Sequence, residues 1–221
     1  MQNNSGTIRV MLVDDHPVVR KGLCLLIERE PDMTVCAEAE DAADALRGAI
    51  EKKPDLVIMD ISLKNSNGLE LLKDFRVQLP DLPVLVLSIH DEMVYAERVL
   101  RAGARGYIMK HEAMDRVLAA IRQVLRGDIY LSEKMQSRVF DLVRHPHSKA
   151  NLPLTQLTDR ELEVFELIGR GQGTRQIADH LNISVKTVEF HISRIKDKLG
   201  LKHHVELIQQ AALWISNENR N

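Results

Sequence analysis

Cysteine and long apolar runs are both scarce in this chain of 221 residues. The two cysteines, Cys24 and Cys36, lack the spacing of metal ligands, so we interpret them as reduced, packed thiols rather than as a disulfide framework. The longest apolar runs, such as Leu82–Leu87, are too short to cross a bilayer. Residues 1–7 form a polar stretch that does not resemble a signal peptide. We therefore expect a cytoplasmic protein.

The chain also lacks the Walker loop and the glycine fingerprint of nucleotide-binding enzymes, and it has no internal repeat. Its 44% apolar and 28% charged residues suffice for ordinary cores, and its length suggests one large domain or two small ones. Residues 1–128 hold 17 Lys and Arg against 21 Asp and Glu, whereas residues 129–221 hold 13 against 11. The segment 170–204, with 7 basic and 3 acidic residues, permits nucleic-acid binding without demonstrating it.

Apolar strands alternate with amphipathic helices over residues 7–128. The predicted strands are 8–13, 34–39, 56–59, 84–87 and 106–109, and the predicted helices are 17–30, 42–52, 68–78, 93–102 and 113–126. Five βα units of this spacing imply an α/β fold, a doubly wound five-stranded parallel sheet with helices on both faces. We expect one domain at 7–128.

A change in composition separates this domain from a second one. Pro, Ser and Asn with little apolar content mark a linker, which we place at 129–153 with a short helix at 132–143. His145 and His147 lie in it without further metal ligands nearby. Residues 154–217 are helical in pattern and predict an all-α domain of four helices.

Helix boundaries in the second domain are marked by capping residues. Thr158 and Glu161 form the pattern of a capping box, Thr174 and Ser184 are candidate N-caps, and Gly200 ends the third helix. The tight turn before Ser184 separates the second helix from the third.

Reactive side chains follow four of the five predicted strands. They are Asp14, Asp15, Asp60, Ser88 and Lys110. Because the carboxyl ends of parallel strands meet at one edge of a sheet, we expect these residues to share a cleft. Asp60 alone would be as consistent with an Asp that starts a turn; the alternative for the whole set is a structural acidic cluster.

Three clustered carboxylates repel one another unless a cation lies among them, and Mg²⁺ is the hard cation that fits best. A carboxylate beside Mg²⁺ and a lysine can attack a phosphoryl donor and form an acyl phosphate. The metal and Lys110 would neutralise the charge on the transferred oxygens, and Ser88 could donate a hydrogen bond to them.

These stretches resemble the receiver domain of two-component response regulators from residue 8 to about 127. The matching segments are Val-Asp-Asp-His-Pro (13–17), Met-Asp-Ile-Ser-Leu (59–63), Asn-Gly-Leu-Glu (67–70), Leu-Ser-Ile-His-Asp (87–91) and Gly-Ala-Arg-Gly-Tyr-Ile-Met-Lys (103–110). The resemblance implies a flavodoxin-like sheet with strand order 2-1-3-4-5.

The resemblance also implies roles for individual residues. Asp60 would be the phosphoacceptor, Asp15 a direct Mg²⁺ ligand, Asp14 a ligand through water, and Ser62 a ligand through its backbone carbonyl. The phosphoryl oxygens would be held by Ser88 and Lys110, and the aromatic switch would be Tyr107, whose ring turns inward when the hydroxyl is recruited.

Two positions near Asp60 refine this interpretation. The family usually has a proline where this chain has Lys64, so we expect a more flexible and more basic loop. A phosphatase with an aspartyl nucleophile needs a second acid two residues later, where this chain has Ser62. We therefore expect no enzyme activity beyond intrinsic autophosphorylation and autodephosphorylation.

The third helix of the second domain has one apolar stripe and one polar face. Val185, Val188, Ile192, Ile195 and Leu199 form the stripe. On the opposite face Phe190 should point outward among basic side chains, a pattern that suits insertion into the major groove of DNA. The alternative is a solvated charged face with an incidental Phe.

Residues 157–212 resemble the LuxR-type helix-turn-helix domain of NarL/FixJ-family regulators. The resemblance lies in Leu-Thr-Asp-Arg-Glu-Leu-Glu-Val (157–164), Gln-Ile-Ala-Asp-His-Leu-Asn-Ile-Ser (176–184), Val-Lys-Thr-Val-Glu-Phe-His-Ile (185–192) and Lys-Leu-Gly (198–200). It implies base contacts from Glu189, Phe190 and Ser193, and phosphate contacts from Lys186, Thr187, His191 and Lys198. Glu189 could accept from a cytosine amino group and Phe190 could pack on a thymine methyl.

The sequence therefore predicts a transcription regulator controlled by phosphorylation of Asp60. Expected partners are a sensor histidine kinase, promoter double-stranded DNA, a second copy of the chain when phosphorylated, and, as a further candidate, RNA polymerase. The apolar residues of the last helix, 205–215, suit either a dimer contact or the core of their own domain. Competing interpretations are a DNA-binding protein whose receiver no longer switches, and a protein-interaction module that does not touch DNA.

Overall fold

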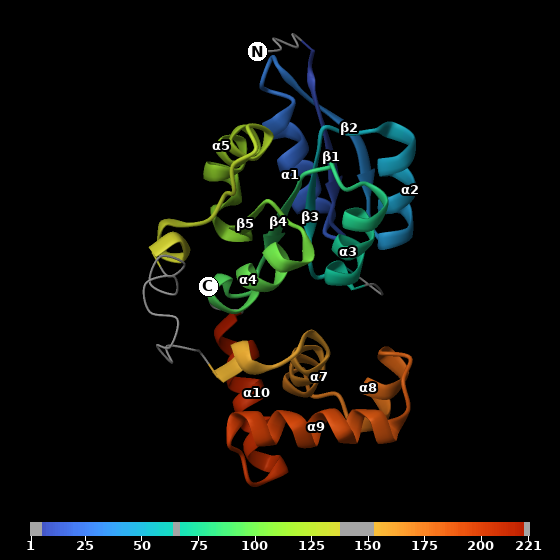
Figure 1. Ribbon diagram of the computed structural model, residues 1–221, viewed down its shortest axis with the longest axis vertical. Coiled ribbons are helices and arrows are strands. Elements are labelled where there is room, and N and C mark those ends of the chain that lie inside the picture. The colour runs from blue at the N-terminus through green and yellow to red at the C-terminus, as the bar shows by residue number, and fades with distance from the viewer. Residues whose placement is uncertain (1–5, 64–66, 138–152, 219–221) are drawn as a thin grey trace. The chain divides into compact units, whose positions relative to one another are not determined.

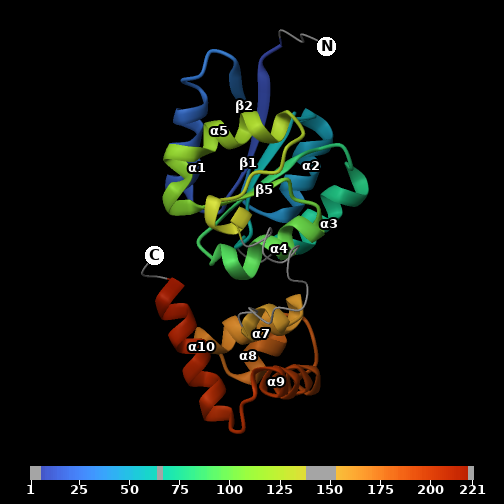
Figure 2. The same cartoon turned by 60° about the vertical axis from the view of Figure 1, so that its left-hand side comes forward.

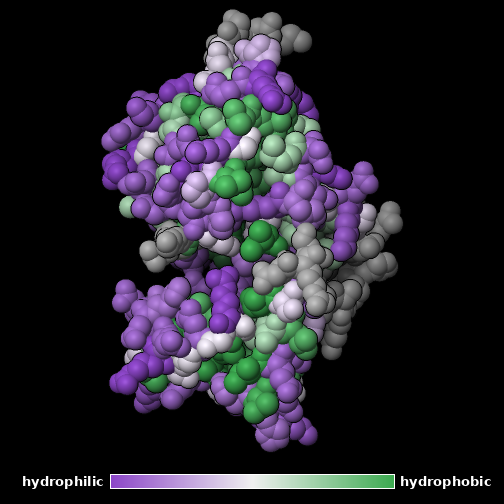
Figure 3. All heavy atoms as spheres, turned by 180° about the vertical axis from the view of Figure 1, so that it is seen from behind, coloured by the Kyte–Doolittle hydropathy of each residue, from purple (hydrophilic) through white to green (hydrophobic). Residues whose placement is uncertain are grey.

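A computed structural model of the chain describes residues 6–63, 67–137 and 153–218. The chain divides into two compact units, Met1–Asp141 and Leu142–Asn221, each of which is described by itself (Figure 1). Lys64, His145 and His147 lie outside the described residues, as does the second half of the expected helix 132–143, whereas residues 133–137 are helical. Among the described helices, none combines the length and apolar character needed to cross a membrane. Hydrophilic side chains cover much of the face seen in Figure 3, and hydrophobic ones form smaller patches.

The first unit contains a five-stranded parallel sheet. Its strands are β1 (Ile8–Val13), β2 (Met33–Ala39), β3 (Leu56–Asp60), β4 (Val84–Ser88) and β5 (Gly106–Met109), in the order β2-β1-β3-β4-β5. This confirms the predicted fold class and strand order. Every residue of β3 and β4 is buried, which explains why these strands have continuous apolar runs instead of alternating patterns.

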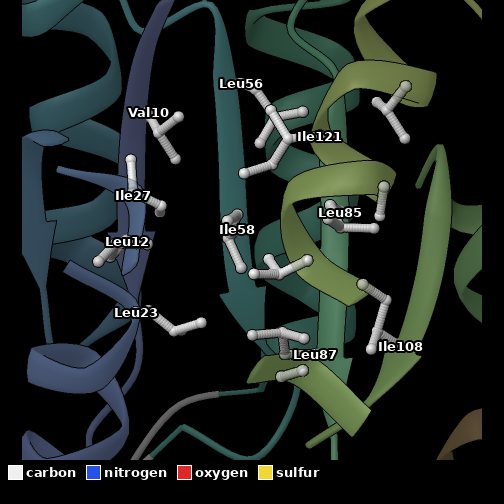
Figure 4. Close-up of a cluster of buried hydrophobic side chains, with 14 of the residues drawn as sticks. Val10, Leu12, Leu23, Ile27, Leu56, Ile58, Leu85, Leu87, Ile108 and Ile121 are labelled. Carbon is white, nitrogen blue, oxygen red and sulfur yellow. The ribbon is translucent and has the colours of Figure 1, made fainter. Parts of the chain in front are cut away.

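Helices cover both faces of the sheet (Figures 1 and 2). One face is covered by α1 (Pro17–Ile27) and α5 (Ala113–Leu125), and the other by α2 (Ala42–Lys52), α3 (Gly68–Gln78) and α4 (Glu92–Ala102). A short 3₁₀ helix, η1 (Lys110–Glu112), precedes α5. Figure 4 shows the core on the first face, where Ile27 of α1 and Ile121 of α5 pack over the sheet residue Ile58 and its neighbours.

Two predicted helices end several residues away from the expected position: the last helix of the chain extends to Glu218 instead of ending at 215, and α1 is shorter. This helix stops at Ile27 instead of continuing to Glu30. Pro31 disfavours the helical conformation of the residue before it, so the chain leaves the helix early and turns into β2.

The segment after α5 lies beside β5. Tyr130 forms a parallel bridge with Gly106, donates its N–H to the Arg105 carbonyl at 2.9 Å and accepts the Tyr107 N–H at 3.0 Å. Ser132 donates its backbone N–H at 3.1 Å and its hydroxyl to the carboxylate of Glu92. The beginning of the expected linker is therefore bound to the sheet.

The second unit is helical. It contains the 3₁₀ helix η2 (Pro153–Gln156) and the helices α7 (Asp159–Gly169), α8 (Thr174–His180), α9 (Val185–Leu199) and α10 (His204–Glu218). The core is formed by Leu162, Phe165, Ile168, Ile177, Val188, Ile192, Ile195, Leu207 and Ala211. The helix α7 packs against both α9 and α10.

Three of the four predicted boundary signals are present. Thr158 and Glu161 form the capping box, the Ser184 hydroxyl accepts the Thr187 N–H at 3.1 Å, and Gly200 ends α9 with φ 69°. The prediction for Thr174 was wrong: Gly173 is the N-cap of α8, and its N–H donates to the Gln176 side chain at 2.8 Å.

Two members of the predicted apolar stripe on α9 are not buried: Val185 is exposed and Leu199 is partly exposed. Val185 is 41% exposed, whereas Val188, Ile192 and Ile195 are buried as expected. Val185 is the first residue of α9, directly after the N-cap Ser184.

Candidate functional site

Carboxylates from two neighbouring strands meet at the carboxyl edge of the sheet. Asp60 is the last residue of β3, and Asp14 and Asp15 follow β1, which pairs with β3. One ligand atom each from these three residues and His16 lie within 4.8 Å of one another. Asp14 and Asp60 are buried. The parallel sheet thus brings the expected acidic residues together.

Lys110 provides the positive charge of this cluster. Its Nζ lies 2.6 Å from Asp60 Oδ2 and 2.8 Å from Asp14 Oδ2. Burial raises the pKa of Asp60 above its usual value, and the attraction of Lys110 offsets only part of that effect. Burial would lower the pKa of Lys110, but the two carboxylates raise it overall. The ammonium therefore stays charged and faces Asp60.

The acidic cluster has the donor atoms that a hard cation requires. Asp14 Oδ2 and Asp15 Oδ1 are buried and accept no hydrogen bond of good geometry. Lys110 Nζ lies 2.8 Å from Asp14 Oδ2 and His16 Nδ1 lies 2.8 Å from Asp15 Oδ1, both at ion-pair distance. Oxygen ligands with spare lone pairs fit Mg²⁺.

The residues beyond Asp60 form a hydrogen-bonded chain centred on His90. The Ser62 N–H donates to Asp60 Oδ1 at 2.9 Å, and Ser62 Oγ lies 2.8 Å from His90 Nε2. The backbone N–H of His90 donates to Ser88 Oγ at 3.1 Å, and its carbonyl accepts the Tyr107 hydroxyl at 2.7 Å. Tyr107 is buried, so its ring lies inside.

Three residues of this region were not predicted from the sequence. His16 joins the acidic cluster, His90 connects Ser62, Ser88 and Tyr107, and Arg20 donates to the backbone carbonyl of Asp14 at 2.7 Å. The position of His16 directly after the acid pair was a usable signal. Arg20 and His90 act through contacts that no local pattern shows.

The exposed face of α9 carries the expected DNA-binding residues. Phe190 is 58% exposed, and the Arg194 guanidinium lies 5.6 Å from the centroid of its ring. Lys186, Glu189 and Ser193 are exposed, and Thr187 and His191 are partly exposed. The aromatic ring thus projects outward beside a cation.

Lys198 has a different environment from the other basic residues of α9. Its Nζ lies 2.6 Å from Oε2 of Glu161, the carboxylate that also accepts the Thr158 N–H in the capping box. This ion pair connects the end of α9 to the start of α7.

Two family models match the chain. The model for the response regulator receiver domain matches residues 10–122. The model for bacterial regulatory proteins of the luxR family matches residues 155–211.

Relatives and solved structures match this chain over nearly its whole length and over nearly all of their own. The oxygen regulatory protein NreC of Staphylococcus haemolyticus is 38% identical over 209 residues, covering 92% of this chain and 96% of that protein. NreC of Staphylococcus carnosus is 37% identical with the same coverage. A structure of the RcsB response regulator of Salmonella typhimurium is 23% identical, covers 95% of this chain and 98% of its own, and superposes with a TM-score of 0.74.

Two further structures are similar to the chain. RcsB of Salmonella enterica serovar Typhimurium, bound to promoter P1flhDC in the presence of the phosphomimetic BeF3-, gives a TM-score of 0.72 at 23% identity, with 93% and 98% coverage. The response regulator ChrA of a heme-sensing two-component system gives 0.51 at 31% identity, with 94% and 98% coverage. The chain therefore belongs to the NarL/FixJ family of response regulators, DNA-binding transcription regulators built from a receiver domain and a LuxR-type helix-turn-helix domain.

Proposed function

We propose that Asp60 accepts a phosphoryl group from a sensor histidine kinase and that this event controls promoter binding by the C-terminal domain. The observation that carries the proposal is the buried Asp60 carboxylate with Lys110 at 2.6 Å and two further carboxylates beside it. We propose domain bounds of 7–128 and 154–217, joined by 129–153, and a cytoplasmic location.

The chemistry requires one bond to form and one to break. A carboxylate oxygen of Asp60 attacks phosphorus, and the bond between phosphorus and the donor's imidazole nitrogen breaks with its electrons going to the imidazole. Lys110 faces the carboxylate and is placed to hold the transferred oxygens. The side chains of Asp15 and Asp60, the Ser62 carbonyl and, through water, Asp14 would hold Mg²⁺, which would supply positive charge beside those oxygens. Any turnover by the chain itself is limited to intrinsic autophosphorylation and autodephosphorylation.

Ser88 and Tyr107 supply the proposed switch. In the structure, Ser88 Oγ accepts the His90 N–H while the His90 carbonyl accepts the Tyr107 hydroxyl. Recruitment of the Ser88 hydroxyl as a donor to a phosphoryl oxygen would compete with its present contact with the His90 N–H and shift the balance between two packings of the face formed by α4, α5 and β5.

We further propose that α9 enters the major groove. Glu189, Phe190 and Ser193 contact base edges, which sets specificity. Lys186, Thr187 and His191 contact phosphates. Lys198 was expected to do the same, but its ammonium is held by Glu161, so we propose that it stabilises the domain instead. The structure of RcsB bound to a promoter, for a protein of the same fold, supports DNA binding by this chain.

The helix α10 is the proposed dimer contact. Leu207 and Ala211 are buried within the unit, whereas Val205, Ile208 and Leu213 are exposed on the same helix. The sequence suited either a dimer contact or the core of the domain. The buried residues of α10 support a core role, and its exposed residues support a dimer contact. RcsB dimers bound to DNA occur among the similar structures. RNA polymerase is proposed as a further partner at promoters.

DNA binding with and without beryllofluoride tests the proposal. With MgCl₂ present, beryllofluoride should raise the affinity of the wild-type chain for selected DNA and leave Asp60→Asn unchanged, because the variant has no carboxylate to bind it. Mass spectrometry after incubation with a small phosphodonor should find phosphate on the wild type only. Equal DNA binding by both proteins in all conditions would refute phosphorylation control, and the absence of any salt-dependent DNA binding would refute the DNA-binding role.

A further inference from the structure

Arg20 connects three segments near the acidic cluster. It lies in the first turn of α1, and its side chain is only 13% exposed. The guanidinium donates to the backbone carbonyl of Asp14, to Glu38 Oε2 and to Glu40 Oε1, each at 2.7 Å. Arg20 thus joins the end of β1 to the end of β2 and the residues that follow.

These contacts fix the backbone of Asp14 on both sides. The N–H of Asp14 donates to the Ala39 carbonyl at 3.1 Å, and its carbonyl accepts from Arg20. The side chain is fixed as well, because Asp14 Oδ1 accepts the His16 N–H at 2.8 Å. The next residue in the same turn is Asp15, so the direction of both carboxylates depends on this backbone.

We propose that Arg20 is a positioning residue for the divalent-cation pocket: it holds Asp14 and Asp15 in the arrangement that binds the cation. This inference rests on the proposed function, because that function places Mg²⁺ among Asp14, Asp15 and Asp60. Arg20 touches none of the three carboxylates, and it acts through the Asp14 carbonyl.

A purely electrostatic role and a positioning role of Arg20 predict opposite changes in cation affinity when its side chain is removed. Loss of a positive charge close to an acidic pocket would strengthen cation binding by simple electrostatics. Loss of the hydrogen bond to Asp14 would let the turn relax and weaken cation binding. The sign of the change therefore distinguishes a positioning residue from a nearby charge.

Calorimetric titration of the full chain with MgCl₂ tests this inference. The variants are Arg20→Met, which removes the charge, and Arg20→Lys, which keeps the charge but cannot reach all three acceptors. We expect Arg20→Met to weaken Mg²⁺ binding by about tenfold or more, the range typical of partners that orient metal ligands, and Arg20→Lys to weaken it less.

Arg122→Met is the matched control. Arg122 lies on α5 in the same unit and pairs with Glu30 and Asp32, so its loss removes a similar pair of ion pairs away from the acidic cluster. This variant should bind Mg²⁺ within about twofold of the wild type while losing thermal stability, as Arg20→Met should also do.

The outcomes distinguish a failure of the role proposed for Arg20 from a failure of the proposed cation site. Wild-type or tighter Mg²⁺ binding by both Arg20 variants would overturn the role of Arg20 and leave the cation site intact. Absence of Mg²⁺ binding by the wild type would reject the cation site and this inference with it. If Arg20→Met fails to fold, Arg20→Lys decides, because its charge is unchanged and only geometry can weaken its binding.

Discussion

Lys186 and Lys198 stand on the same helix, but their ammonium groups have different neighbours. No described carboxylate pairs with Lys186, whereas Lys198 is held by Glu161. We expect Lys186→Ala to reduce the slope of log affinity against log salt by about one, the value of a lost phosphate contact. Lys198→Ala should leave the slope unchanged and lower the stability of the second unit by about 1 kcal/mol. Fluorescence anisotropy over a salt series measures the slopes; an equal decrease for both variants would assign Lys198 to the phosphate contacts.

The carboxyl of Glu161 should make the second unit sensitive to acid. Burial alone would raise its pKa, but hydrogen bonds from Lys198 and Thr158 hold it below its usual value. Because this pKa is lower in the folded than in the unfolded chain, the stabilisation is complete above the unfolded value of about 4.3 and is lost as pH falls through the folded value. Urea unfolding followed by fluorescence of the single tryptophan, Trp214, should show this loss in the wild type. Glu161→Gln should lack this loss of stability. The same acid dependence in both proteins would show that Glu161 is not its source.

At the scale of elements, the contact between α7 and α10 depends on a missing side chain. A Cβ on Gly169 would lie 2.5 Å from the Ala211 carbonyl oxygen and 2.7 Å from Ile215 Cγ1. Alanine normally stabilises a helix relative to glycine by roughly 0.5–1 kcal/mol. Here we expect Gly169→Ala to destabilise the second unit by about 2 kcal/mol, because α10 must move away.

Gly22→Ala is the control for this substitution. Gly22 lies within α1, and a Cβ there would meet only Met114 Sδ at 3.8 Å, an ordinary contact. The thermal stability of the Gly22→Ala variant should equal or exceed that of the wild type. A gain of stability in Gly169→Ala as well, in calorimetric melts, would show that α10 adapts without cost.

Most elements of both units were predictable because their signals are local. Buried parallel strands have unbroken apolar runs, amphipathic helices repeat every three to four residues, and caps such as Thr158 and Ser184 mark helix starts. The early end of α1 and the cap at Gly173 were missed. At Gly173 the first helical N–H groups have no side-chain oxygen from the cap residue itself, so the usual signal does not exist.

The candidate site was predictable only in part. Parallel strands force Asp14, Asp15, Asp60, Ser88 and Lys110 toward one edge, so their proximity followed from topology. The contacts of Arg20 with Glu38 and of Glu161 with Lys198 join segments 18 and 37 residues apart. Their side chains have no periodic signal, because charged residues on a surface face suit many partners equally.

For the whole molecule, two copies would join through the exposed apolar side of α10. Ile208→Ser should lower the affinity for DNA with two half-sites by about tenfold, equivalent to about 1.4 kcal/mol, in the presence of beryllofluoride, and should leave binding to one half-site unchanged. Val77→Ser, which changes an exposed apolar residue of α3, is the control. An equal effect on one and two half-sites would place Ile208 outside the dimer contact.

The hydrogen bonds of Tyr130 determine where the receiver domain can be truncated without exposing an edge of its sheet. The strand β5 is at the edge of the sheet, and Tyr130 pairs there with the carbonyl of Arg105 and the N–H of Tyr107. A fragment ending at residue 128 would expose this edge, and open edges promote strand-to-strand aggregation. We expect fragment 7–137 to stay monomeric in light scattering without a phosphodonor and fragment 7–128 to self-associate as concentration rises. The segment that leads to the DNA-binding domain thus also protects the receiver from its own copies.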